Sequence, residues 1–427
     1  MAISDPAITS ADSVQQQPVI RPLGRIRLVL TLGFIVALGP LTIDMYLPAL
    51  PTITTDLAAS ETAIQFTLTG TFAGLALGQL LVGPLSDTVG RRLPLIAGAG
   101  LHVLASVLCA VSPNVETLSV FRILQGVGAA AGSVVALAIV RDLYVGRAAA
   151  TLLSRLMLVI GVAPVFAPTV GGALLVVLPW QGVFGVLAVL GVALMLLVSF
   201  TLPETLPKAG RRPFGLGQIA RTAGQLVRDR IFVGLTLVAG LAMTGVFGYV
   251  AGASFVFQEQ FGVSSQTFGL LFGVGGILLV VATQLNPVLL KRWEPEQVLT
   301  AGAVLAALSG VALLLTATLS LGGLVGILVP VWAALFSASL ALPNAPALAL
   351  SRHGEAAGTA AALLGAVQFG IGAIAAPLVG ALGTDAVAMA VVMSAGLALS
   401  LITLLAVVRP WQPGVQATST EPVVVVH

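Results

Sequence analysis

Long apolar stretches separated by short polar turns follow one another along almost the whole chain. Their length is the informative feature, because a helix needs about 20 apolar residues to cross the hydrocarbon core of a bilayer. Twelve stretches meet this requirement, at residues 26–50, 63–83, 93–112, 116–140, 148–178, 180–202, 231–257, 266–290, 297–319, 321–350, 358–382 and 385–408. The pattern therefore predicts an all-α membrane protein with twelve transmembrane helices.

One long polar connection, from Pro203 to Arg230, divides this series into two sets of six. It predicts an N-terminal six-helix bundle at 21–202, a basic cytoplasmic linker at 203–230 and a C-terminal six-helix bundle at 231–409. The segments 1–20 and 410–427 are expected to be cytoplasmic tails, the first of them disordered. The sequence GRAAAT at Gly146 recurs as GEAAGT at Gly354, and APTVGGAL at Ala167 recurs as APLVGAL at Ala376. These repeats indicate a parallel duplication, with the substrate path between the two halves.

Composition agrees with a protein that lies almost wholly in lipid. Hydrophobic residues make up 58% of the chain and charged residues 8%, whereas soluble domains carry about a quarter charged residues. No large soluble domain fits this composition. The net charge of +3 is not a nucleic-acid signal, because the basic residues flank apolar spans instead of forming a patch.

The positions of the basic residues predict the orientation, since short cytoplasmic loops retain Lys and Arg. With a cytoplasmic N-terminus, all 19 Lys and Arg except the two within spans, Arg122 and Arg155, fall on the cytoplasmic side. The opposite connections carry only acids, at Asp56, Glu61, Glu116, Glu259 and Asp385. We therefore expect a multi-pass protein with both termini cytoplasmic. The preference for Arg over Lys, with abundant Ala, Gly and Val, favours a GC-rich bacterium and hence the bacterial cytoplasmic (inner) membrane.

Asp44 is the one carboxylate inside a predicted span and away from its cytoplasmic end. A charge at the bilayer centre costs at least ~2.5 kcal/mol, so such groups usually face a cavity and find partners. Arg122 lies at a similar depth in the fourth span and is the expected partner. One hypothesis is that Asp44 binds a proton from outside and that movement relative to Arg122 changes its proton affinity. The alternative is a fixed ion pair that holds the first span to the fourth. Arg155, near the cytoplasmic end of the fifth span, is expected to snorkel.

The segment Gly83–Arg92, GPLSDTVGRR, follows the second span. Its glycines and proline favour a tight turn, and it resembles the cytoplasmic loop motif of the major facilitator superfamily. That resemblance implies a conformational gate that braces the outward-open state. The implied gate residues are Gly83, Asp87, Gly90, Arg91 and Arg92 in the loop, with Arg141 and Asp142 at the end of the fourth span. The second half, at Asn286–Pro295, has no equivalent of Asp87.

Three further stretches resemble proton-antiport drug exporters of that superfamily: LTIDMYLPALP at Leu41, RILQGVG at Arg122, and GVAPVFAPTVGG at Gly161. The first two imply that Asp44 and Arg122 couple transport to protons. The third resembles the antiport signature of the fifth span, which implies roles for Gly161, Pro164, Pro168, Gly171 and Gly172. Plain helix packing by small residues is the alternative explanation for that span.

The whole set is most similar to the bicyclomycin-resistance, or Bcr/CflA, branch. This resemblance implies a proton-coupled multidrug antiporter that exports small amphiphilic antibiotics, bicyclomycin- or chloramphenicol-like, by alternating access. A mostly apolar pocket suits such substrates. The residues expected to line it are Asp44, Tyr46, Phe66, Arg122, Gln125, Tyr249, Phe255, Asn344, Gln368 and Phe369. Export or symport of a metabolite such as a small peptide, amino acid or sugar is the alternative.

An enzyme or channel is not expected. His102, His353 and the single Cys109 show no metal-ligand spacing, and the sequence has no nucleotide-binding loop. We therefore expect no metal and no cofactor, and a proton gradient as the energy source. The expected partners are a small-molecule drug, protons and the lipid bilayer, without nucleic acid, and the protein is expected to be a monomer.

Overall fold

The computed structural model describes residues 22–144, 146–211, 216–353 and 356–411. The predicted tails, 1–20 and most of 410–427, lie outside the described residues. All secondary structure in the described ranges is helical. The longer elements are α1 (Pro22–Asp44), α3 (Glu61–Val89), α4 (Arg92–Ala110), α5 (Val115–Leu143), α6 (Gly146–Val177), α7 (Gln181–Thr201), α9 (Arg230–Phe255), α10 (Ser265–Leu289), α11 (Pro295–Thr318), α12 (Gly323–Ala341), α14 (Ala357–Leu382) and α15 (Ala386–Thr403).

Shorter elements complete some of the spans. The first span continues from α1 through η1 (Leu47–Ala49) into α2 (Leu50–Asp56), and the tenth continues from α12 into α13 (Asn344–Ser351). The π-helical turns η3 (Val256–Gln260) and η5 (Leu404–Val408) lengthen α9 and α15. Among the described residues, twelve helices are long and apolar enough to cross a membrane. The predicted twelve-helix architecture is therefore confirmed, with boundaries that differ by only a few residues from the predicted ones.

The tight turn expected to begin at Gly83 was wrong in position. Helix α3 runs on through Pro84 to Val89, and the chain turns only at Gly90, which has a φ of +100°. The Ser86 hydroxyl donates to the Gly83 carbonyl, and the Thr88 hydroxyl donates to the Pro84 carbonyl. These bonds support the helix beyond the proline, and only the residue without a β-carbon reverses the chain.

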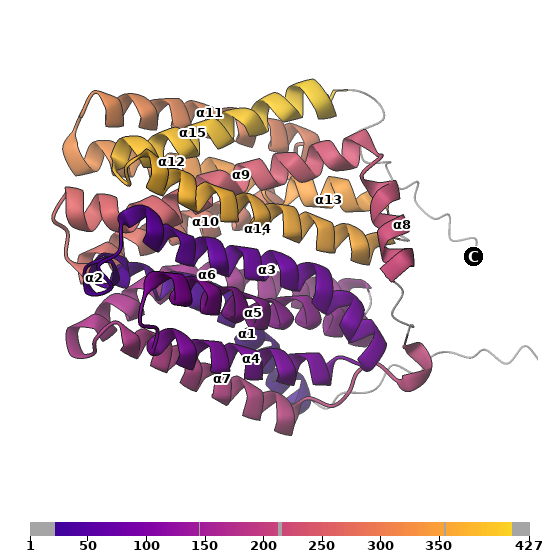
Figure 1. Cartoon of the computed structure of the whole chain (residues 1–427). Coiled ribbons are helices and arrows are strands. Elements are labelled where there is room, and N and C mark those ends of the chain that lie inside the picture. The colour runs from indigo at the N-terminus through magenta and orange to yellow at the C-terminus, as the bar shows by residue number, and fades with distance from the viewer. Residues whose placement is uncertain (1–21, 145, 212–215, 354–355, 412–427) are drawn as a thin grey trace, which may run out of the picture.

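The connection between the halves is also partly helical. It contains η2 (Lys208–Gly210) and α8 (Leu216–Leu226). Helix α8 runs along one end of the molecule beside α14 (Figure 1). Its last residue, Leu226, is buried with Phe232 in the core of the second half. Helix α8 therefore packs against the second half.

The helices form two groups, one from each half of the chain, and Figure 1 shows them as the lower and upper parts of the molecule. In the first half the most extensive contact is between α3 and α5, and in the second half it is between α11 and α12. Gly74 of α3 explains the close approach: a β-carbon there would lie 2.1 Å from the Ile123 carbonyl oxygen of α5. Small residues are what lets membrane helices approach so closely.

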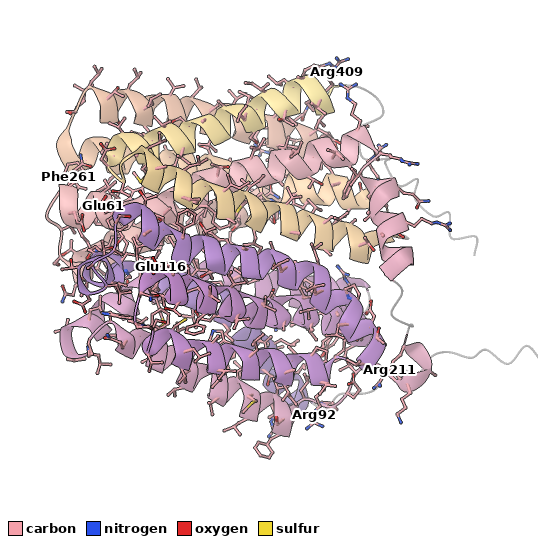
Figure 2. The ribbon with its side chains drawn as sticks, viewed as in Figure 1. Glu61, Arg92, Glu116, Arg211, Phe261 and Arg409 are labelled. Carbon is pink, nitrogen blue, oxygen red and sulfur yellow. The ribbon has the colours of Figure 1, made fainter. Side chains whose placement is uncertain are left out.

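The two ends of the bundle differ in charge. One end carries Arg92, Arg211 and Arg409, and the other carries Glu61 and Glu116 (Figure 2). We call them the basic end and the acidic end. The sequence predicts that the basic end is cytoplasmic.

The halves meet through α3 with α14 and α6 with α10. Five hydrogen bonds among the described residues join them near the acidic end. They run from Thr62 to the Gly380 carbonyl (2.8 Å), from Gln65 to the Ala251 carbonyl (2.7 Å), from Ser254 to the Leu47 carbonyl (2.7 Å), from Gln258 to the Pro48 carbonyl (3.3 Å) and from Thr169 to the Gly269 carbonyl (3.1 Å). The structure is therefore a state in which the halves are fastened together at the acidic end.

Candidate functional site

Asp44 is the last residue of α1, at the point where the helix breaks before η1. Only 4% of the residue is exposed. Within the described part of the chain, no hydrogen bond or ion pair to its carboxyl group is found. The next carbonyl, that of Met45, packs directly on Gly171 of α6, where a β-carbon would lie 2.2 Å from the oxygen. Asp44 therefore lies buried and unpaired where α1 passes close to α6.

Arg122 of α5 is fully buried, but it does not form the predicted ion pair with Asp44. Its Nη1 donates instead to the Thr42 carbonyl at 3.0 Å and to Gln125 Oε1 at 2.6 Å. The guanidinium group also lies over the Tyr46 ring, 4.5 Å from its centroid. The prediction was wrong for this state because α1 ends at Asp44, which leaves the Thr42 carbonyl without its helical partner. A cation is stabilised at such a helix C-terminus.

Two donors of Arg122, Nε and Nη2, are buried without a hydrogen-bond partner among the described residues. A buried donor left unpaired costs about 1–3 kcal/mol, and more when it is charged. The guanidinium group is therefore only half satisfied in this state. It retains the capacity to bind a carboxylate.

A histidine that the sequence interpretation considered only as a metal ligand belongs to this network. His102 Nε2 lies 2.8 Å from the Thr42 hydroxyl, which itself donates to the Leu38 carbonyl. The hydroxyl must then accept from His102, which places the imidazole proton on Nε2. Gln125 donates to Ser106 at 2.8 Å. The network thus connects α4 and α5 to the end of α1. The one sequence feature that could have indicated the role of His102 was its position as a polar residue within an apolar span.

Of the expected pocket residues, Tyr46 and Gln125 face the interior of the first half. The Tyr46 hydroxyl pairs with that of Thr67 at 2.9 Å. In the second half, Tyr249 and Phe255 are buried, and Tyr249 stacks on Phe272 with ring centroids 4.6 Å apart. Tyr249 lies within electrostatic range of Asp44 across the boundary between the halves.

The remaining pocket residues are dispersed. Asn344 is buried and bonded to Asn286, whereas 48% of Phe66 is exposed. On α14, Gln368 and Phe369 are partly buried, and Phe369 contacts Phe247 at 5.9 Å between centroids. Tyr249 thus lies within electrostatic range of Asp44, whereas Asn344 is engaged by Asn286 and Phe66 is exposed. Membership of a substrate pocket stays a prediction for all of these residues.

The expected gate residues gather around Arg91 at the basic end. Arg91 donates to Ser86 Oγ at 2.8 Å, to Asp87 at 2.5 Å and to Asp142 at 2.8 Å. Burial by itself lowers the pKa of Arg91, but the hydrogen bonds and charges of the two carboxylates raise it above its usual value. This cluster joins the α3–α4 connection to the end of α5.

Glu204, which the sequence interpretation did not select, completes this cluster. Its carboxylate accepts from the backbone N–H groups of Arg91 (2.7 Å), Leu206 (3.0 Å) and Arg92 (3.3 Å). Burial raises the pKa of Glu204, but these backbone donors and the charge of Arg211 together lower it below its usual value. A β-carbon at Gly90 would lie 2.3 Å from this carboxylate and would displace it, and the φ of +100° is what favours glycine at this position.

Three other gate residues lie at the edge of the cluster. The Arg92 guanidinium group donates to the Ser199 carbonyl of α7. Arg141 is exposed, and Gly83 has only ordinary contact with Val134. These three residues therefore make fewer polar contacts within the cluster than Arg91 or Glu204.

The antiport signature on α6 lies along the boundary between the halves. A β-carbon at Gly172 would lie 2.6 Å from the Ser265 carbonyl oxygen of α10, and one at Gly161 would lie 3.1 Å from Val280. Pro164 and Pro168 are both inside the helix, and the Pro168 carbonyl faces Gly269, whose β-carbon would be 2.8 Å away. The small residues therefore allow α6 and α10 to touch through their backbones.

Comparison with known proteins identifies relatives of the chain. Residues 32–377 match the model of the Major Facilitator Superfamily. An uncharacterized MFS-type transporter of Bacillus subtilis, YdgK, is 41% identical over 87% of this chain and 93% of its own. The bicyclomycin resistance protein homolog of Haemophilus influenzae is 32% identical over 84% of this chain and 90% of its own. The multidrug resistance protein MdtL of Klebsiella pneumoniae is 31% identical over 65% of this chain and 70% of its own.

Solved structures agree on the fold. A bacterial homolog of the human lysosomal transporter Spinster, in an inward-facing conformation, aligns with a TM-score of 0.68 at 16% identity, covering 91% of this chain and 95% of that one. The xylose transporter XylE of E. coli, partially occluded and inward open, aligns with a TM-score of 0.69 at 15% identity, covering 89% and 96%. From the family match and these relatives, the chain is a membrane transporter of the major facilitator superfamily, in its bicyclomycin-resistance (Bcr/CflA-like) branch.

Proposed function

We propose that this transporter exports small amphiphilic antibiotics in exchange for protons, by alternating access between its two halves. The observation that carries the proposal is Asp44, a carboxyl group that is buried, has no hydrogen bond or ion pair among the described residues, and follows closely on the Thr42 carbonyl that Arg122 binds. An ionised carboxylate buried without a partner costs several kcal/mol. We therefore assign the neutral carboxylic acid to this state.

Arg122 supplies the other half of the proposed exchange. Its unpaired Nε and Nη2 donors are suited to a carboxylate, which an arginine binds through two parallel hydrogen bonds. In our proposal Asp44 releases its proton to the cytoplasm before the drug-loaded halves rearrange, and the carboxylate then turns to Arg122. Proton release and substrate binding thereby compete through one side chain.

The direction of transport follows from the proposed orientation, with the basic end and both termini in the cytoplasm. The hydrogen bonds of Gln65 and Ser254 then close the outer side of the path in this state. The drug enters from the cytoplasm or the inner leaflet, and opening of the acidic end releases it outside. Asp44, in the outer part of its span, is then reloaded with an external proton.

A vesicle assay tests the proposal. Everted membrane vesicles that contain the protein are energised with a pH gradient, and uptake of ethidium and of chloramphenicol is measured with and without a protonophore. We expect uptake that collapses with the protonophore in the wild type. Asp44→Asn, which cannot release a proton, should lower gradient-driven uptake at least 100-fold while drug binding to the purified protein changes less than about threefold.

Asp56→Asn is the matched control. Asp56 is also an acid of the first span, but it lies at the acidic end and accepts from the Trp180 indole N–H at 2.9 Å, a bond that an amide oxygen can retain. It should transport like the wild type. Gradient-driven uptake by Asp44→Asn at the wild-type rate would refute the coupling role, and uptake of neither drug by the wild type would refute drug export.

A further inference from the structure

Two polar atoms of the second half are buried beside each other without hydrogen bonds. They are the Tyr249 hydroxyl of α9 and the Trp332 indole N–H of α12, and neither has a hydrogen-bond partner among the described residues. The Trp332 N–H is close enough to the Tyr249 hydroxyl for a weak polar interaction, but it falls outside hydrogen-bond geometry. Since each unpaired buried polar group costs about 1–3 kcal/mol, a pair of them at one place is a feature that a bound ligand would explain.

The surroundings hold the Tyr249 hydroxyl in place. The Tyr249 ring stacks almost flat on Phe272, at an interplanar angle of 13°. A β-carbon at Gly275 would lie 3.3 Å from the hydroxyl oxygen and 3.1 Å from Leu335. Trp332 is one helical turn before Leu335 on α12, so α9, α10 and α12 all meet at this hydroxyl.

We propose that Tyr249 and Trp332 form a subsite that binds an uncharged oxygen acceptor of the substrate, a carbonyl or hydroxyl group, next to Asp44. This inference rests on the drug-export function proposed above and names the chemistry of its substrate. Trp332 contributes a donor and no acceptor, and the Tyr249 hydroxyl contributes a second donor. Two donors that converge in this way suit one oxygen with two lone pairs.

The charge that Asp44 can carry determines which kind of substrate oxygen the subsite can bind. Asp44 acts on Tyr249 across the boundary, so an anionic substrate group would be repelled whenever Asp44 is ionised. A neutral carbonyl or hydroxyl avoids this repulsion once Asp44 has released its proton. Phe257, 6.2 Å from Tyr249 between ring centroids, adds an apolar wall for the rest of an amphiphile.

The experiment compares two substrates that differ in this group. Chloramphenicol is uncharged and carries an amide carbonyl and hydroxyl groups, whereas ethidium is a cation without oxygen. Tyr249→Phe removes one oxygen atom and keeps the stacked ring. We expect it to raise the apparent KM for chloramphenicol about 5- to 10-fold, the loss of one hydrogen bond, and to change that for ethidium less than twofold. Trp332→Phe should act in the same direction.

Tyr144→Phe is the matched control, because the Tyr144 hydroxyl is also buried and unpaired but lies at the basic end of α5. It should leave the KM of both drugs unchanged. Three results would each overturn the subsite. They are equal effects of Tyr249→Phe on the two drugs, no effect of Tyr249→Phe on either drug, and a wild type that transports ethidium but not chloramphenicol. Each of these leaves drug export intact. Gradient-independent ethidium uptake in the wild type would instead refute proton coupling. If Trp332→Phe fails to reach the membrane, Tyr249→Phe decides alone.

Discussion

The two halves join corresponding helices at the basic end with different chemistry. In the first half, Arg91 holds Asp87 and Asp142 together at the ends of α3 and α5. In the second half, between the end of α10 and the start of α13, which continues the span of α12, Asn344 donates to Asn286 Oδ1 at 2.8 Å and to the Leu340 carbonyl at 2.7 Å. A charged joint in one repeat thus stands opposite a neutral amide joint in the other.

This difference extends into the membrane. Asp44 and the fully buried Arg122 belong to the first half, whereas Tyr249, Trp332 and the amide pair of the second half are neutral. Charged contacts respond to protonation, to salt and to water reaching the site, but buried amide contacts do not. The second half has its own charged contacts at the start of α9, where Asp229 lies 2.9 Å from His353 and 3.6 Å from Arg352. The contrast therefore concerns the two joints and not the halves as wholes.

Arg91→Ala tests the charged joint and should have the largest effect. The Arg91 side chain is 7% exposed and binds two carboxylates, and removal of one partner from a buried ion pair typically costs 3–5 kcal/mol. Asp142 retains a hydrogen bond from Thr205 at 3.1 Å, so we expect the free energy of unfolding to fall by about 3 kcal/mol, the lower end of this range. The measurement is the free energy of unfolding in mixed detergent micelles, together with the initial rate of drug uptake.

Arg92→Ala is the control for this variant, because the Arg92 side chain is less buried and donates to a single carbonyl group. Arg92→Ala should lower the free energy of unfolding clearly less than Arg91→Ala does. Equal losses for the two arginines would mean that general surface charge, and not the cluster around Arg91, stabilises the basic end.

Much of this fold follows from the sequence because lipid imposes strong rules. Spans must be long and apolar, and basic residues mark their connections, so the twelve helices and the division near Pro203 could be predicted. The helical loop motif and the position of α8 could not. They depend on local hydroxyl bonds at Ser86 and on packing of Leu226 against Phe232, which apolar patterning does not record.

The site was predicted less completely. Sequence reasoning selected Asp44, Arg122 and Arg91 because charged residues stand out in an apolar chain. It paired Asp44 with Arg122 from their depth alone, whereas the broken end of α1 offers the guanidinium group a backbone carbonyl. It missed Glu204 and Trp332, since an acid at a span end and a tryptophan within a span are ordinary residues until their neighbours are known.

The amide joint should show a smaller effect and a distinctive pattern. Asn286→Leu leaves the amide of the buried Asn344 without one partner, which we expect to lower the free energy of unfolding by about 2 kcal/mol. Asn344→Leu should act similarly. The double variant should cost at least 1 kcal/mol less than the sum of the two, because neither partner is then orphaned. Additive losses would show that the two amides do not stabilise each other.

The stability that Glu204 contributes depends on pH. This dependence gives the smallest expected effect and tests the charged joint of the first half. Its pKa in the folded protein is lowered from the ordinary value of 4.5, so its stabilisation is fully present above pH 4.5 and disappears as the pH falls through the lower, folded-state value. Glu204→Gln should therefore cost about 1 kcal/mol at pH 7 and almost nothing at pH 3. Glu116→Gln, the same substitution at an exposed position of the acidic end, should cost less than Glu204→Gln at pH 7. A constant difference between Glu204→Gln and the wild type from pH 7 to pH 3 would show that the carboxylate does not hold the α3–α4 connection through its charge, and the contrast between the charged joint and the amide joint would then rest on Arg91 alone.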